Sequence, residues 1–155
     1  MAIRNLKDLK AILPPQASLL GLDVGAKTIG VAVSDPERRL ARPLLTIKRS
    51  RFAADAQRLR AIYEEEKAAG FVIGLPINMD GSEGPRCQSV RQFAANLLAA
   101  FACELAFWDE RLSTAAVTRR MIEGGVSRKK RRALVDKAAA AYILEGALDF
   151  LARAP

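Results

Sequence analysis

The chain has 155 residues, with 25 lysines and arginines against 17 aspartates and glutamates, two cysteines and no histidine. This length fits one domain, and a net charge of +8 with a pI near 10.0 is typical of a protein that binds a polyanion. The lack of histidine excludes Ser-His-Asp triads, Cys-His dyads and HExxH zinc sites, so any chemistry must use carboxylates, lysines, hydroxyls or a hard metal ion.

Nothing in the sequence predicts a membrane span, a signal peptide or a disulfide framework. Its apolar runs are shorter than the roughly 20 residues that a span needs. The first residues, MAIRNLKDLK, lack the apolar core of a signal peptide. Cys87 and Cys103 do not have the spacing of a thiolate zinc motif. We therefore expect a cytoplasmic protein that does not bind membranes and whose thiols are reduced.

The first half of the chain predicts a short helix followed by three strands. Leucines recur at helical spacing over residues 1–13, which predicts a short amphipathic helix that stops at Pro14 and Pro15 and is followed by a turn. Residues 1–17 are expected to be an accessory segment of the domain. The apolar, β-branched runs 18–24 and 28–34 flank the turn 25–27 and predict a hairpin. A third strand is expected over residues 42–48.

Helices and strands alternate in the rest of the prediction. A helix over 51–69 has Ser50 as a plausible N-cap and Gly70 as its C-cap. The apolar run 71–75 predicts a buried strand, and a polar loop over 76–85, a helix and a fifth strand over 105–108 follow. Helices over 114–123 and 128–152 end the chain. This order predicts a single α/β domain over residues 1–155, with a mixed five-stranded sheet flanked by helices.

Asp23 is the first candidate site residue, because it is an acid in an otherwise apolar strand. Alternation places it on the same face as Leu19 and Gly21. A charge in a central strand is costly unless it is paired or binds a metal. The alternative is an aspartate that only caps the following turn.

Two adjacent acids, Asp109 and Glu110, lie where the fifth strand is expected to end, which is a common position for functional groups in α/β sheets. They would point to opposite faces if the strand persisted, so one of them is expected in a site. The local sequence does not choose between them. A solvated strand end with an Asp109–Arg111 surface pair is the competing interpretation.

Asp136 lies at the head of an apolar helical stripe. Its neighbours at i+4, i+7 and i+11 are Ala140, Ile143 and Ala147, so the stripe would draw the carboxylate toward the sheet. A solvated Asp136 paired with Lys137 or an arginine is the alternative. If three acids converge, hard oxygen ligands without histidine or thiolate favour Mg²⁺ or Mn²⁺, and two such ions could assist phosphodiester hydrolysis.

A basic run precedes this helix and would provide phosphate-binding charge beside the acids. It consists of Arg128, Lys129, Lys130, Arg131 and Arg132, and Arg111 is a further candidate contact to nucleic acid. A solvated charged face is the competing interpretation of the run. The loop over 76–85 either contacts substrate or is a plain surface turn.

Four blocks of sequence together resemble the YqgF-type family of pre-16S rRNA nucleases, also described as Holliday-junction resolvase-like. They are GLDVGAKTIGVAVSD at 21–35, IGLPINMDGSEG at 73–84, DERLST at 109–114 and VDKAAAAYIL at 135–144. The resemblance implies an RNase H-like fold with catalytic, metal-binding acids at Asp23, Glu110 and Asp136. It thus selects Glu110 over Asp109, and it implies processing of the 5′ end of the small-subunit ribosomal RNA precursor.

The main hypothesis is therefore a magnesium- or manganese-dependent hydrolase that cleaves RNA in preference to DNA and acts as a monomer or homodimer. One alternative is a Holliday-junction-resolving DNA endonuclease, which would need two active sites in a dimer. The other is a nucleic-acid-binding module without catalysis, whose affinity would fall with salt and would not depend on the acids.

Overall fold

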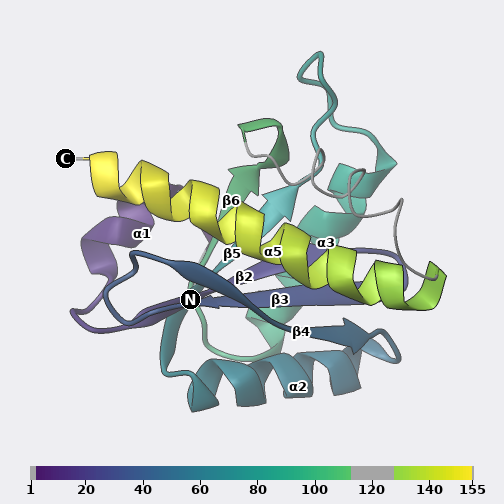
Figure 1. Ribbon diagram of the computed structural model, residues 1–155, viewed down its shortest axis with the longest axis horizontal. Helices are drawn as coiled ribbons and strands as arrows, with labels where there is room; N and C mark the ends of the chain where they lie inside the picture. Colours follow the sequence, from purple (N-terminus) through teal and green to yellow (C-terminus); the bar gives the residue numbers. More distant parts are fainter. Residues whose placement is uncertain (1–2, 113–127, 155) are drawn as a thin grey trace.

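The computed structural model describes the backbone of residues 3–112 and 128–154, and the side chains of residues 3–112 and 137–154 (Figure 1). The expected helix over 114–123 lies outside these residues. Within the described part, no helix combines the length and the apolar character that crossing a membrane would require.

Six strands form one mixed sheet in the order β1-β6-β5-β2-β3-β4. The pairs β2–β3 and β3–β4 are antiparallel, whereas β2–β5, β5–β6 and β6–β1 are parallel. The carboxyl ends of β2, β5 and β6 therefore lie at one edge of the sheet. The strands are β1 (Ile3–Arg4), β2 (Ser18–Val24), β3 (Thr28–Ser34), β4 (Ala41–Lys48), β5 (Ala68–Leu75) and β6 (Leu105–Asp109).

Helices cover both faces of this sheet (Figure 1). On one face, α2 (Phe52–Glu65) and α3 (Pro85–Ala100) bury one apolar cluster with β2 residues such as Leu20 and Leu22. On the other face, α5 (Arg128–Arg153) crosses the strands and α1 (Leu6–Ile12) packs near its end. The short 3-10 helix η1 (Glu110–Leu112) continues directly from β6. Because β2 is buried between both layers, every residue along it has less than one tenth of its surface exposed.

The predicted α/β fold is confirmed, and the hairpin strands begin and end at the expected residues. The sheet has six strands where five were expected, because residues 1–17 supply β1 in addition to a helix. Ile3 of β1 pairs with Leu105 of β6. The Asn5 side chain then accepts a hydrogen bond from the Asp8 backbone N–H at 2.8 Å and starts α1.

The expected bounds of the second helix were wrong at both ends. Arg51 is the N-cap of α2, and Asp55 in the first turn accepts hydrogen bonds from the Ser50 backbone N–H and hydroxyl, each at 3.2 Å. The helix ends at Glu65, and Lys67 reverses the chain with a φ of 53°. Gly70 lies inside β5, where a Cβ atom would be 3.2 Å from Leu19 Cδ2. Gly70 is therefore explained by close packing and not by a helix end.

Candidate active site

Asp23 is a buried acid on the α5 face of the sheet. It lies near the end of β2, opposite Gly30 of β3, and has 6% of its surface exposed. Its alternate neighbour Gly21 faces α5 so closely that a Cβ there would lie 2.8 Å from the Ala140 carbonyl oxygen. Side chains two residues apart on a strand share a face, so Asp23 projects to the same side. The face that alternation predicted for Asp23, the face of Leu19 and Gly21, is therefore the one that α5 covers.

Glu110 reaches over β5 on that same face. It is the first residue of η1, directly after β6. Its Cγ atom lies 3.0 Å from the position that a Cβ on Gly74 would occupy, and Ile143 Cδ1 of α5 lies 2.5 Å from that position. Gly74 therefore leaves the space that Glu110 and Ile143 fill.

The strand register places Asp23 and Glu110 on the same face of the sheet. The parallel pairing of β2 with β5 runs to Leu22 and Ile73, so the next residues along the two strands are Asp23 and Gly74. Since the Cγ atom of Glu110 lies over Gly74, Glu110 and Asp23 both belong to the same edge of the sheet and to the same face. Two carboxylates placed in this way repel each other and favour a bound cation.

The backbone of Asp136 belongs to α5, whose described residues Ala140 and Ile143 lie over Gly21 and Gly74. Position 136 is about one turn before Ala140 and two turns before Ile143, on the same side of the helix. Its side chain is outside the described part of the structure. No group of three or more acids, cysteines or histidines that could hold a metal occurs among the side chains that are described.

Asp109 forms an ion pair with Arg111. Its carboxylate accepts hydrogen bonds from the Arg111 guanidinium, the shortest at 2.7 Å, and from the Arg111 backbone N–H at 3.0 Å. The Arg111 guanidinium, opposed only in part by desolvation, lowers the pKa of Asp109. The Asp109–Arg111 pair of the competing interpretation thus exists beside Glu110. It neutralises one of the two adjacent acids and orients Arg111.

The loop that follows β5 contacts the same edge. Asn78 and Ser82 close a turn through an Asn78 N–H to Ser82 carbonyl bond of 3.0 Å, and Gly81 has a φ of 91°. The Arg111 guanidinium lies 3.5 Å from the Met79 carbonyl oxygen, while the Met79 side chain is 87% exposed. The loop over 76–85 is therefore an ordered structure at the edge of the candidate site.

The basic run forms the first residues of α5, and its side chains lie outside the described part. The structure shows a cation that sequence reasoning missed, Arg49. Its guanidinium donates to the Gly25 carbonyl at 2.7 Å and lies 5.3 Å from the centre of the Phe93 ring. Strand pairing of β3 with β4 brings Arg49 to the turn after Asp23, and no local sequence signal indicates it.

Curated relatives match nearly the whole chain. A protein of Rhodospirillum centenum is 56% identical over 97% of this chain and 83% of its own length. Relatives from Rhodopseudomonas palustris and Rhizobium meliloti are 60% and 55% identical, over 90% and 98% of this chain and 87% and 92% of their own lengths. All three carry the name "Putative pre-16S rRNA nuclease".

Among solved structures, Thermus thermophilus RuvC in complex with a Holliday junction substrate superposes with a TM-score of 0.53. That alignment covers 88% of this chain and 96% of the RuvC chain at 15% identity, so it supports the RNase H-like fold alone. The family model described as "RuvX: Holliday junction resolvase" matches residues 17–150. The chain therefore belongs to the RuvX family.

Proposed function

We propose that this protein is a divalent-metal-dependent nuclease that hydrolyses phosphodiester bonds of pre-16S ribosomal RNA in the cytoplasm during ribosome maturation. The observation that carries the proposal is the placement of buried Asp23 beside Gly74, the glycine over which Glu110 lies. The names of the relatives supply the substrate.

The proposed metal ligands are Asp23, Glu110 and Asp136. Carboxylate oxygens suit Mg²⁺ or Mn²⁺, and the chain has no histidine that could direct the site to a softer metal. A buried carboxylate such as that of Asp23 needs compensation by a paired group or a metal ion. A bound ion of this kind supplies an activated water and neutralises charge on the phosphate.

The chain's own residues position the substrate and the acids. Pairing with Gly30 of β3 holds the backbone of Asp23, and β5 pairs with β2 up to Leu22. Ile143 of α5 fills the space over Gly74 and limits the positions open to Glu110. Asp109 holds Arg111, whose guanidinium is then available at the edge of the site for a phosphate of the substrate. We propose that the run 128–132 binds further phosphates as the strand leaves the site.

Residues 1–17 are proposed to support this site within a single domain. Lys10 of α1 donates hydrogen bonds to the carbonyls of Leu151 and Ala154, each at 2.6 Å. These bonds satisfy carbonyls at the end of α5, which otherwise lack partners in the helix. The accessory segment would thus fix the helix that carries Asp136.

The second candidate function is resolution of four-way DNA junctions, and the family description favours it. A resolvase must cut two paired strands, so it would need a homodimer with two active sites. The RNA nuclease has no such requirement and could act as a monomer or a homodimer.

Cleavage of a precursor rRNA fragment and of a four-way DNA junction, each with Mn²⁺ or with EDTA, tests the proposal. Wild type should cut the RNA only with metal, and Asp23→Asn and Glu110→Gln should each lose this activity. Asp8→Asn and Glu65→Gln are matched controls, because they remove the same charges at exposed helical positions. Activity on the junction alone would favour the resolvase. Full RNA cleavage by Asp23→Asn would refute the assigned site.

Measuring RNA binding and RNA cleavage side by side distinguishes a non-catalytic binding module from a nuclease. A pure binding module should bind RNA with an affinity that falls steeply with salt and is equal in wild type and Glu110→Gln. It should release no product with Mn²⁺, although a cooperative unfolding transition shows that the protein in the assay is folded.

A further inference from the structure

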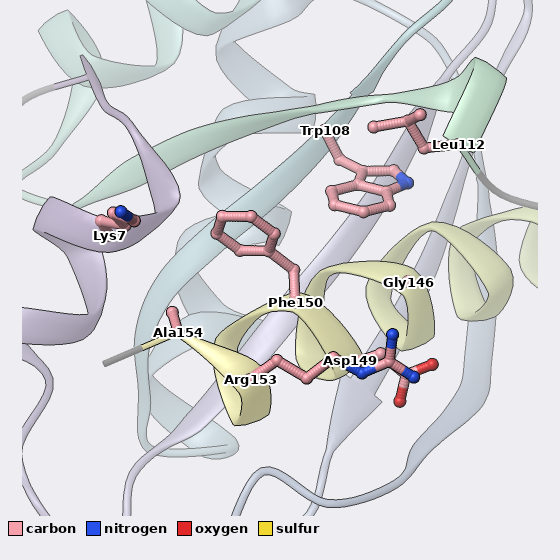
Figure 2. Close-up of a pocket in the computed structure, with 8 residues that line it drawn as sticks. All are labelled: Lys7, Trp108, Leu112, Gly146, Asp149, Phe150, Arg153 and Ala154. Atoms are coloured by element: carbon pink, nitrogen blue, oxygen red, sulfur yellow. The ribbon is translucent and has the colours of Figure 1, made fainter.

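A hollow of about 480 Å³ lies on the α5 face of the sheet, between α1, η1 and the second half of α5 (Figure 2). Trp108 and Phe150 supply aromatic rings to it, and Leu112 lies at its border. Lys7 and Arg153 bring positive charge to the hollow, against one acid, Asp149. We call this hollow the Trp108 pocket.

The aromatic rings of the Trp108 pocket differ in exposure. Phe150 is 40% exposed, whereas Trp108 is 7% exposed, and their ring centres lie 6.4 Å apart at 62°. Gly146 makes room for the indole, because a Cβ there would lie 2.8 Å from Trp108 Cζ2. The Phe150 ring is therefore accessible to a ligand, whereas the Trp108 ring is buried beside it.

The indole nitrogen of Trp108 is a buried hydrogen-bond donor without an acceptor, judged over the side chains that the structure describes. Figure 2 shows this nitrogen at the edge of the ring that faces away from Phe150. A buried donor without a partner is unfavourable by the cost of removing it from water. Because this nitrogen is buried, the acceptor of a ligand would reach it only if a neighbouring side chain such as Leu112, which is 69% exposed, moved aside.

The Trp108 pocket lies next to the candidate active site. Trp108 pairs with Gly74, the glycine beneath Glu110, and Ile143 packs over that glycine. Gly146 and Phe150 follow Ile143 by three and seven residues, which is about 4.5 and 10.5 Å along the helix axis at a rise of 1.5 Å per residue. The Trp108 pocket therefore lies along α5 from the residue that packs beside Glu110.

We propose that the Trp108 pocket binds an unpaired base of the RNA substrate near the cleaved bond. The base stacks on Phe150, and Lys7 and Arg153 contact the adjoining phosphates. Grooves that combine an aromatic ring with cations are typical of single-strand recognition, because every base has a face that can stack. This inference rests on the proposed nuclease function and names the form of RNA that the site accepts.

The chain contains one tryptophan, so its intrinsic fluorescence reports on this pocket directly. Titration with a short single-stranded RNA in EDTA should change Trp108 fluorescence saturably. An oligonucleotide that lacks one base should bind more weakly when the abasic position occupies the pocket. Phe150→Ala should weaken binding by about 5- to 150-fold, the range expected for loss of one stacked base. Ile12→Ala is the matched control, since Ile12 is 43% exposed on α1.

Arg153→Gln provides a second test that leaves the aromatic rings in place. It should weaken binding and reduce its salt dependence, whereas Arg39→Gln removes the same charge from an exposed position and should not change the fluorescence response. Thermal unfolding of each variant verifies that it is folded. Equal affinities of wild type and both pocket variants, or an equal response to fully base-free RNA backbone, would overturn the proposal.

The experiment separates this inference from the proposed function. Metal-dependent RNA cleavage without a pocket effect would contradict the base-binding role and leave the nuclease intact. A base-dependent fluorescence response without any cleavage would support the pocket and contradict the nuclease. Stronger binding of fully paired RNA than of single strands would also refute an unpaired base as the ligand.

Discussion

The close packing of Glu110 and Ile143 over Gly74 predicts how much stability the protein loses when a side chain is added at this position. In Gly74→Ala, the new Cβ would lie 2.5 Å from Ile143 Cδ1 and 3.0 Å from Glu110 Cγ. Overpacking of this kind costs about 1–3 kcal/mol. Since 1 kcal/mol shifts the Tm of a domain of this size by about 2–4 °C, the Tm should fall by about 2–12 °C.

A second substitution separates the two contacts. Ile143→Val removes the atom closest to the new Cβ and alone should cost about 0.5–1.5 kcal/mol. In the double variant the two losses should therefore be less than additive. The displacement of Glu110 would remain, so RNA cleavage should stay impaired while stability recovers. Urea unfolding and cleavage with Mn²⁺ measure the two effects on the same samples. Wild-type stability and activity in Gly74→Ala would refute this packing.

Three further predictions concern charged groups around the fold. Asp55→Ala should destabilise the protein by about 1–3 kcal/mol in urea unfolding, because Asp55 is 3% exposed and the Ser50 backbone N–H would lose its acceptor. Lys10→Ala should accelerate amide exchange in the last turn of α5 and spare the centre of the sheet; equal protection would contradict the capping role. Because Arg111 lowers the pKa of Asp109 below its ordinary value of 3.8, the pair should stabilise the fold above that pH and lose its effect as pH falls through the lowered pKa. In Arg111→Gln the Asp109 titration, followed by NMR, should move up toward the ordinary value, and an unchanged midpoint would refute the pairing.

Local sequence patterns predicted the elements whose burial alternates or repeats regularly. The strands containing Leu20 and Val31 were predicted with their correct ends, and the side on which Asp23 projects followed from alternation alone. Gly70 shows the limit of such patterns. A glycine after a helical stripe is typical of a C-cap, yet contacts with Leu9 and Leu19 explain it here, and those residues are distant in sequence.

The candidate site depended more strongly on tertiary structure. The choice between Asp109 and Glu110 required the family resemblance, since the local sequence favours neither acid. In the structure, Arg111 pairs with Asp109, and Gly74 leaves space that the Glu110 side chain occupies. The Trp108 pocket had no sequence signal, since α5 and β6 are brought together only in the folded chain.

Metal binding by the three acids is the central claim, and calorimetric titration with Mn²⁺ tests it most directly. Wild type and Asp8→Asn should bind Mn²⁺ saturably, and Asp136→Asn and Asp23→Asn should lose this binding while remaining folded. The same two variants should lose RNA cleavage. Equal Mn²⁺ affinity in wild type, Asp23→Asn and Asp136→Asn would contradict the proposed active site.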